Sequence, residues 1–276
     1  MLKKVYLEIS NICNLHCSFC PGTRREARSL TPREFDFLTD RLRGHTAYLY
    51  FHLMGEPLLH PQLDELLRIS GEKGFRVMIT TNGTLLWRRG ETLISSPAVH
   101  KINISLQSFE ANDGGEISDY VNQCAAFAAR AAAAGKICEL RLWNRGGLER
   151  LNGEILRLLE KTFPGPWQTG RRSTKLAERV WLAEDDRFDW PDLGAADRGE
   201  GCFCYALRDQ IGVLCDGTVV PCCLDHEGDA ALGNLFDNEL VEIMSTKKAR
   251  DIYNGFSQRK AVEELCRRCG YARRFT

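Results

Sequence analysis

The alternation of strand-like and helix-like segments most constrains the fold of this chain. Short apolar segments typical of strands recur about every 25–35 residues, and segments with helical periodicity lie between them. Such alternation predicts parallel strands joined by right-handed helical crossovers. Six such units are too few for a closed eight-stranded barrel, so we expect an α/β fold with a partial (βα)6 TIM-like barrel. The expected strands are 5–10, 48–53, 75–80, 101–106, 137–143 and 178–183.

The expected helices have recognisable start signals. Thr31-Pro32-Arg33-Glu34 combines an N-cap threonine, a proline at the first helical position and a glutamate three residues after the cap. Ser118 is expected to cap the alanine-rich helix that runs toward Gly135. Toward the C-terminus, Asp216-Gly217 predicts a hairpin between 210–214 and 218–220. Further helices are expected at 63–73, 85–94, 151–163 and 238–254.

Composition and charge argue against several classes of function. The 37 basic and 37 acidic residues cancel, so no electrostatic argument favours nucleic acid or a membrane surface. No apolar run approaches the roughly 20 residues of a membrane span. The first strand starts by residue 5, so we expect neither a signal peptide nor a peptide-recognition domain before the barrel. Twelve cysteines without an export signal suit metal or cluster ligation in a reducing cytoplasm better than disulfides.

Three cysteines follow the first strand at a C-x3-C-x2-C spacing, Cys13, Cys17 and Cys20. Three thiolates on one short loop can hold three corners of a cubane iron–sulfur cluster. Because the loop has no fourth thiolate, one iron stays open to an outside ligand. The alternative is a structural zinc site, which usually pairs two such hooks, and a second hook exists at Cys266 and Cys269.

This loop resembles the signature of the radical S-adenosylmethionine (SAM) enzymes, in which the open iron chelates the amino and carboxylate groups of SAM. The resemblance implies reductive cleavage of SAM to a 5′-deoxyadenosyl radical that abstracts hydrogen from a substrate. It also implies that Phe19 packs against the adenine and that Ser105 binds the ribose hydroxyls. Gly55-Glu56-Pro57 resembles the motif that receives the methionine ammonium group, although Met54 replaces the motif's first glycine.

Three further polar residues lie on the expected strands or at their ends. Asn82 begins an Asn-Gly turn and is either a turn residue or a SAM contact. Arg141 is either a solvated arginine or a bidentate ligand for the carboxylate of SAM or of the substrate. Glu8 faces away from Leu7 and Ile9, and an unpaired charge inside a barrel is costly, so we expect it to contact cofactor or substrate.

A second cysteine pattern occupies the C-terminal part. Its C-x12-G-x4-C spacing with a trailing C-x2-C resembles Twitch, the shortened form of the SPASM auxiliary-cluster domain. The resemblance implies one auxiliary 4Fe–4S cluster without an open site, held by Cys204, Cys222, Cys266 and Cys269. Cys202 is an alternative to Cys204, and structural zinc is an alternative to the cluster. Cys223 is a candidate hydrogen-atom donor.

These patterns together predict a SAM-binding barrel over 1–183, a connector over 184–201 and a small hairpin-plus-helix cluster domain over 202–276. We expect two 4Fe–4S clusters, SAM, and an external one-electron reductant of the flavodoxin or ferredoxin type. The expected reaction is the net oxidation of a small molecule. The alternatives are a maturase that crosslinks or epimerises a peptide or protein, and, in another class, a non-catalytic zinc or electron-transfer protein.

Overall fold

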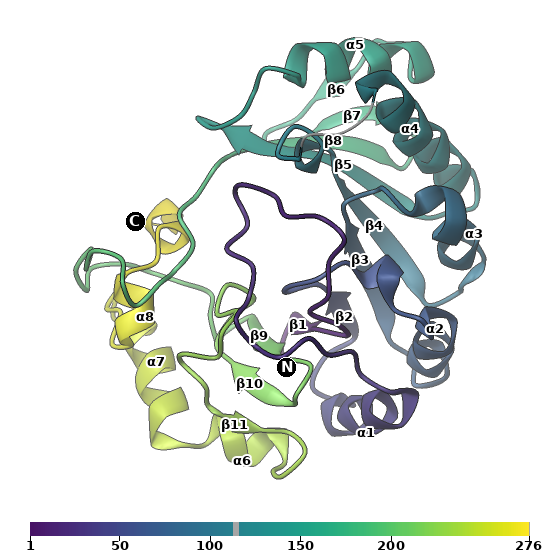
Figure 1. Ribbon diagram of the computed structural model, residues 1–276. Coiled ribbons are helices and arrows are strands. Elements are labelled where there is room, and N and C mark those ends of the chain that lie inside the picture. The colour runs from purple at the N-terminus through teal and green to yellow at the C-terminus, as the bar shows by residue number, and fades with distance from the viewer. Residues whose placement is uncertain (113–115, 276) are drawn as a thin grey trace.

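One curved, open sheet forms the frame of the molecule. The computed structural model describes residues 1–112 and 116–275, so Thr276 of the predicted C-terminal domain lies outside the described residues. Six neighbouring strands are parallel and follow one another in chain order. They curve around a central space (Figure 1), which confirms the predicted partial barrel. These strands are β1 (Lys4–Leu7), β2 (Tyr48–Phe51), β3 (Arg76–Thr81), β4 (Val99–Ser105), β5 (Ile137–Arg145) and β8 (Val180–Asp186).

Helices cover the outer face of this sheet (Figure 1). The Thr31 side chain and Glu34 form the predicted capping box at the start of the first helix. The prediction that Ser118 caps the fourth helix is wrong: Glu116 is the N-cap, and Ser118 lies in the first turn. The helices are α1 (Pro32–Leu42), α2 (Leu63–Glu72), α3 (Leu86–Ser95), α4 (Ile117–Ala133) and α5 (Asn152–Thr162).

The two faces of the sheet differ in chemistry, as strand β1 illustrates. Val5 and Leu7 are fully buried in the apolar core, whereas Lys4 and Tyr6, at the alternate positions, line the central cavity. The polar inner face therefore keeps a space for ligands, while the outer face supplies the packing.

The sheet continues on both sides of the six parallel strands. Strand β9 (Gln210–Val213) pairs in parallel with β1, and β10 (Thr218–Val220) forms the predicted hairpin with it before β11 (Gly233–Asn234). At the other edge, β7 (Thr174–Ala177) and β6 (Gln168–Thr169) add antiparallel strands to β8. These two edge strands were not predicted, because hydrophobic periodicity is weak in that part of the chain.

The prediction of a single helix over 238–254 is wrong, because the structure has two helices there. The chain forms α6 (Leu240–Met244) and then α7 (Lys247–Ser257). The Thr246 hydroxyl accepts a hydrogen bond from the amide of Ala249 and so begins a new helix instead of continuing the first. A short α8 (Glu264–Arg267) follows and carries Cys266. No helix in the described segments is long and apolar enough to cross a membrane.

Candidate active site

The loop that carries Cys13, Cys17 and Cys20 crosses the mouth of the barrel, where the carboxyl ends of the strands lie (Figure 1). Partial burial raises the pKa of all three thiols, and the neighbouring thiols raise those of Cys13 and Cys17 further. The three thiols are therefore close enough to influence one another. A bound metal centre would reverse this effect, because coordination deprotonates a thiol.

The spacing of these thiols bears on the choice between zinc and a cluster. Within residues 1–112 and 116–275, no three His, Cys, Asp or Glu side chains are arranged to hold a single metal ion. A four-iron cluster is larger than one ion, and its thiolates stand further apart. Three thiols on one loop have the chemistry that an iron–sulfur cluster needs, and structural zinc stays the alternative.

A buried ion pair that the sequence did not reveal anchors this loop. Arg25, five residues after Cys20, donates to both carboxylate oxygens of Glu8, at 2.6 and 2.8 Å. Glu8 also accepts a hydrogen bond from the amide of Cys215, beside the hairpin turn. The expectation that Glu8 contacts cofactor or substrate is therefore wrong, because the charge of Glu8 is neutralised within the protein.

The Gly55-Glu56-Pro57 segment contacts the start of the same loop. The amide of Glu56 donates to the carbonyl of Ile12 at 2.8 Å. The Glu56 carboxylate accepts hydrogen bonds from the Thr81 hydroxyl and from the amides of Leu58 and Asn82. Burial nevertheless raises the pKa of Glu56 to about 7. A cation placed nearby would favour the carboxylate, which suits the predicted ammonium contact.

Gly55 is required where it stands. Its φ is +78°, and a Cβ there would lie 2.3 Å from the carbonyl oxygen of Ser10. We expect Gly55→Ala to destabilise the protein by about 1–3 kcal/mol more than Gly44→Ala, because only the former inserts an atom into packed backbone. Gly44 is a matched control, with φ +77° and no atom within 4 Å of the position that a Cβ would take. Urea unfolding of both variants measures the difference, and equal losses would contradict the close approach.

Asparagine side chains connect the loop to the ends of strands β3 and β4. Asn82 donates to the side chain of Asn14 at 3.0 Å, and Asn112 donates to Cys17 Sγ at 3.1 Å. Asn82 therefore acts at least as a support for the loop. The roles of Asn14 and Asn112 were not predicted, since an isolated asparagine in a loop carries no spacing signal.

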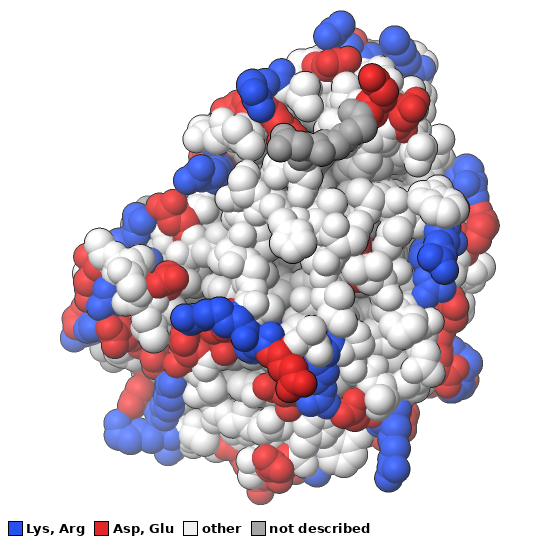
Figure 2. Space-filling model, viewed as in Figure 1, with Lys and Arg blue, Asp and Glu red and all other residues white. Residues whose placement is uncertain are grey.

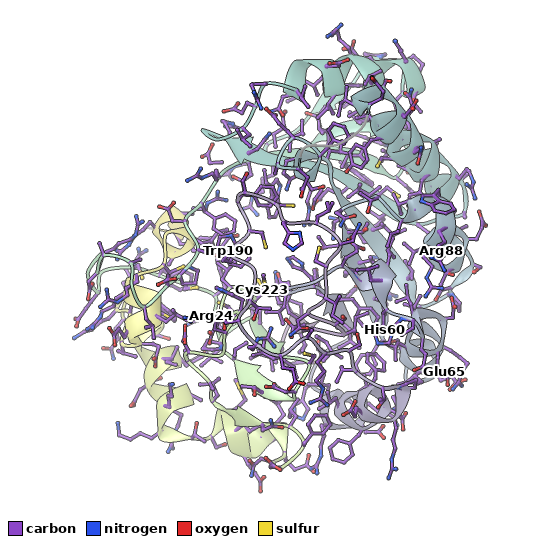
Figure 3. All side chains as sticks on the ribbon, viewed as in Figure 1. Arg24, His60, Glu65, Arg88, Trp190 and Cys223 are labelled. Carbon is purple, nitrogen blue, oxygen red and sulfur yellow. The ribbon has the colours of Figure 1, made fainter. Side chains whose placement is uncertain are left out.

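One cavity of about 800 Å³ opens below this loop, between the barrel and the C-terminal segment. Of the predicted SAM contacts, Phe19, Ser105 and Arg141 line it. Gly55, Glu56, Pro57 and Asn82 do not line it and lie at the strand ends under the cysteine loop. The indole of Trp190 closes one side by donating to the carbonyl of Phe19 at 3.0 Å. Figure 3 shows Trp190 and Cys223 beside the central opening.

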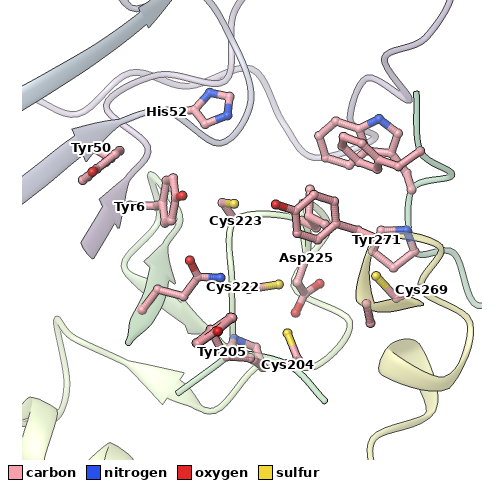
Figure 4. A pocket seen from close by; sticks show the side chains of 18 of the residues that line it. Tyr6, Tyr50, His52, Cys204, Tyr205, Cys222, Cys223, Asp225, Cys269 and Tyr271 are labelled. Carbon is pink, nitrogen blue, oxygen red and sulfur yellow. The ribbon is translucent and has the colours of Figure 1, made fainter. Parts of the chain in front are cut away.

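The C-terminal cysteines meet at the same cavity. All four predicted auxiliary ligands line it, Cys204, Cys222, Cys266 and Cys269. Burial is the main cause of the raised pKa values of these thiols, and it raises the pKa of Cys204 to about 12. Neighbouring thiols raise these pKa values further. Figure 4 shows the sulfurs of Cys204, Cys222 and Cys269 around one space. The donor set therefore fits an enclosed cluster.

The two leftover cysteines of this region occupy different positions. Cys202 is buried and does not line the cavity, which favours Cys204 as the ligand. Cys223 lines the cavity on the side of Tyr6 (Figure 4), and burial raises its pKa. Cys223 is also close enough to Cys222 and Cys269 for the thiols to influence one another's pKa.

Charges are sparse around the mouth of this cavity. Figure 2 shows mostly uncharged side chains over the centre of the visible face, with acidic and basic residues mixed around its rim. A partial barrel with three thiols at its mouth and four more across the same cavity defines a class of barrel enzymes built around iron–sulfur clusters.

The chain belongs to the radical SAM superfamily. The family model of this superfamily matches residues 7–144, half of the chain, and a model described as an iron–sulfur cluster-binding domain, SPASM, matches residues 202–270. These matches imply SAM and 4Fe–4S clusters as cofactors. The individual ligands and SAM contacts named above stay predictions.

Known relatives share this organisation to different extents. The tungsten-containing aldehyde ferredoxin oxidoreductase cofactor-modifying protein of Pyrococcus furiosus is 33% identical over 90 residues, which is 31% of this chain and 25% of that protein. The PqqA peptide cyclase of Streptomyces rochei is 28% identical, over 95% of this chain and 80% of the relative. The crystal structure of BtrN with AdoMet and 2-DOIA is similar in fold, with a TM-score of 0.60 and 20% identity over 98% of this chain and 93% of BtrN.

Proposed function

We propose that this radical SAM enzyme catalyses the net oxidation of a small molecule, with the substrate bound between the two cluster sites. The observation that carries the proposal is the shared cavity. Phe19, Ser105 and Arg141 line it together with the four auxiliary cysteines. A substrate in this space is near both the predicted SAM contacts and the predicted electron acceptor. Its volume of about 800 Å³ suits a small molecule.

When bound, the first cluster and SAM would supply the radical that accepts a hydrogen atom from the substrate, and the auxiliary cluster would accept the electron that the substrate then gives up. The residues of the chain hold and orient these groups. Cys13, Cys17 and Cys20 would ligate the first cluster, while Glu56 holds the loop and would bind the ammonium group of SAM. Trp190 and Phe19 cover one side of the cavity and limit the access of water.

The proposal also needs an electron source and a compartment. An external one-electron reductant of the flavodoxin or ferredoxin type would deliver the electron to the first cluster. We place the enzyme in a reducing cytoplasm, because the twelve cysteines are free in the structure and thiols persist under reducing conditions.

A peptide is the second candidate substrate. The match to the PqqA peptide cyclase over 95% of this chain favours it. In that case the reacting segment of the peptide would enter the cavity. The reaction would be a crosslink or an epimerisation rather than the oxidation of a free metabolite.

One anaerobic assay tests the core of the proposal. The protein is reconstituted with iron and sulfide, given dithionite and SAM, and assayed for 5′-deoxyadenosine with small-molecule and peptide pools. Substrate-dependent deoxyadenosine with a small molecule that becomes two hydrogens lighter supports the main proposal, whereas a peptide that becomes two hydrogens lighter indicates a crosslink. An uncrosslinked peptide product of unchanged mass and inverted configuration would instead identify an epimerase. A zinc-loaded protein that makes no deoxyadenosine would refute radical chemistry.

The auxiliary ligand set predicts a difference between two neighbouring cysteines. Two four-iron clusters give about eight irons per chain. We expect Cys204→Ser to lower this to about four, because Cys204 lines the cavity with the other three thiols, whereas Cys202→Ser should retain about eight. Iron analysis of both variants after reconstitution measures this. The reverse result would make Cys202 the ligand.

A further inference from the structure

The inner wall of the cavity carries more positive than negative charge. Among the described residues, six Lys or Arg side chains line the cavity against two Asp side chains, Asp209 and Asp225. Three of the six cations come from the barrel strands themselves, Lys4, Lys101 and Arg141. The overall balance of 37 basic and 37 acidic residues makes this local excess specific to the cavity.

Two of these strand cations share one carboxylate. Lys101 Nζ lies 2.6 Å from one oxygen of Glu139, and Arg141 Nε lies 2.7 Å from the other. All three side chains are more than three-quarters buried. The guanidinium of Arg141 also lies over the Trp143 ring, 4.4 Å from its centroid. Within the described residues, the hydrogen bonds of Arg141 use only Nε, so its terminal nitrogens remain available for an acceptor.

The third strand cation forms no ion pair with a carboxylate among the described residues. Lys4 Nζ donates to the Tyr6 hydroxyl at 2.9 Å and lies over the rings of Tyr6 and Tyr50, at 5.0 and 5.3 Å. Burial is the main cause of the lowered pKa of Lys4. The nearby Cys223 and Asp209 oppose this effect, whereas the charge of Arg141 adds to it. The pKa of His52 is lowered to about 4, mainly by burial and in addition by the charges of Arg141 and Lys4. The groups are therefore close enough to repel one another.

The wall also presents acceptors that lack donors. The side-chain oxygens of Asn103 and Gln107 are buried without a hydrogen-bond partner among the described residues. Both residues line the cavity and are less than one-tenth exposed. Asn103 lies between Lys101 and Ser105 on β4, two positions from each, so the three side chains share one face of the sheet. A buried acceptor without a donor is costly, which indicates that a ligand supplies the donor.

We propose that the substrate carries an anionic group, a carboxylate or a phosphate, that binds among Lys4, Lys101 and Arg141, and a hydroxyl or amine that donates to Asn103. Of the two carboxylates that Arg141 was predicted to bind, that of SAM and that of the substrate, this proposal assigns Arg141 to the substrate. The carboxylate of Glu139 is shared by Lys101 and Arg141, and Asp209, the acidic neighbour of Lys4, already pairs with Lys3 at 2.7 Å, so positive charge stays in excess. An anion would remove the repulsion among the three strand cations and form charge-assisted hydrogen bonds. This inference rests on the proposed function, in that the cavity holds the substrate.

Calorimetric titration of the reconstituted enzyme, saturated with SAM, tests the inference. The probes are succinate, inorganic phosphate and the neutral polyol erythritol. We expect at least one anion to bind and erythritol not to bind at the same concentrations. Succinate binding alone would identify a carboxylate site, and phosphate binding alone a phosphate site. Lys4→Met and Lys101→Met should each weaken the binding by at least about tenfold, the value of one charge-assisted hydrogen bond.

Lys247→Met is the control, because Lys247 is an exposed surface lysine. It should bind the anions like the unchanged enzyme. Three results would overturn the inference: no anion binding, equal weakening in all three variants, or displacement of SAM by the anion, which would assign the cations to the carboxylate of SAM. Deoxyadenosine formation in the same samples after dithionite is added, without substrate, tests SAM cleavage separately from anion binding.

Discussion

Replacing Cys13 with alanine is expected to abolish the cleavage of SAM while leaving about half of the iron. We predict that the first cluster is held by all three loop thiolates and that its fourth iron binds SAM. The four auxiliary thiols lie across the cavity on other elements and do not depend on Cys13. Both quantities are measured after anaerobic reconstitution. The deoxyadenosine yield should fall to background, and the iron per chain should fall from about eight to about four.

Cys138→Ala provides the control for this experiment. Cys138 is fully buried in the apolar core on β5 and does not line the cavity, so its thiol has a packing role. The variant should retain its iron and its SAM cleavage, with only a small loss of stability. Undiminished deoxyadenosine in Cys13→Ala would remove Cys13 from the ligand set.

Glu8→Gln is expected to lower the free energy of unfolding by about 3–5 kcal/mol, because it leaves the charge of Arg25 partly buried without its partner. The Glu8 side chain is fully buried and that of Arg25 is 14% exposed, so water cannot fully replace the lost contact. Urea denaturation measures the change. We also expect weaker SAM cleavage, since Arg25 fixes the cysteine loop.

Asp251→Asn is a matched control for Glu8→Gln. Asp251 pairs with Lys247 on the exposed face of α7, and such surface pairs contribute less than about 1 kcal/mol. A loss in Glu8→Gln no larger than in Asp251→Asn would show that the buried pair does not stabilise the fold. Normal SAM cleavage in a destabilised Glu8→Gln would separate its structural role from any role in catalysis.

Local patterns in the sequence predicted most of the barrel. Each of the six parallel strands came from a short apolar segment, and the capping box at Thr31 marked the start of α1. These signals are local and depend on backbone geometry. The break between α6 and α7 was missed because helical periodicity continues through Ser245 and Thr246, and only the hydroxyl of Thr246 interrupts it.

Long-range partners could not be predicted in the same way. The cysteine spacings indicated two groups of thiols, but nothing in them indicated that the second group lines the same cavity as Phe19 and Arg141. Likewise, Glu8 was recognised as an expensive charge, yet its partner Arg25 lies in an irregular loop without periodicity. The cluster of cations formed by Lys4, Lys101 and Arg141 arises from three separate strands.

The pairing of β1 with β9 has a consequence for how the protein is made. Glu8 and Cys215, joined by a hydrogen bond beside this pairing, are 207 positions apart in the chain. During synthesis the first strand emerges from the ribosome long before its second neighbour exists. Contacts of such separation form late and slow the folding of a domain. We therefore expect the cysteine loop to remain accessible to iron and sulfide until β9 has been made, and β9 and the segments after it to enclose the loaded site.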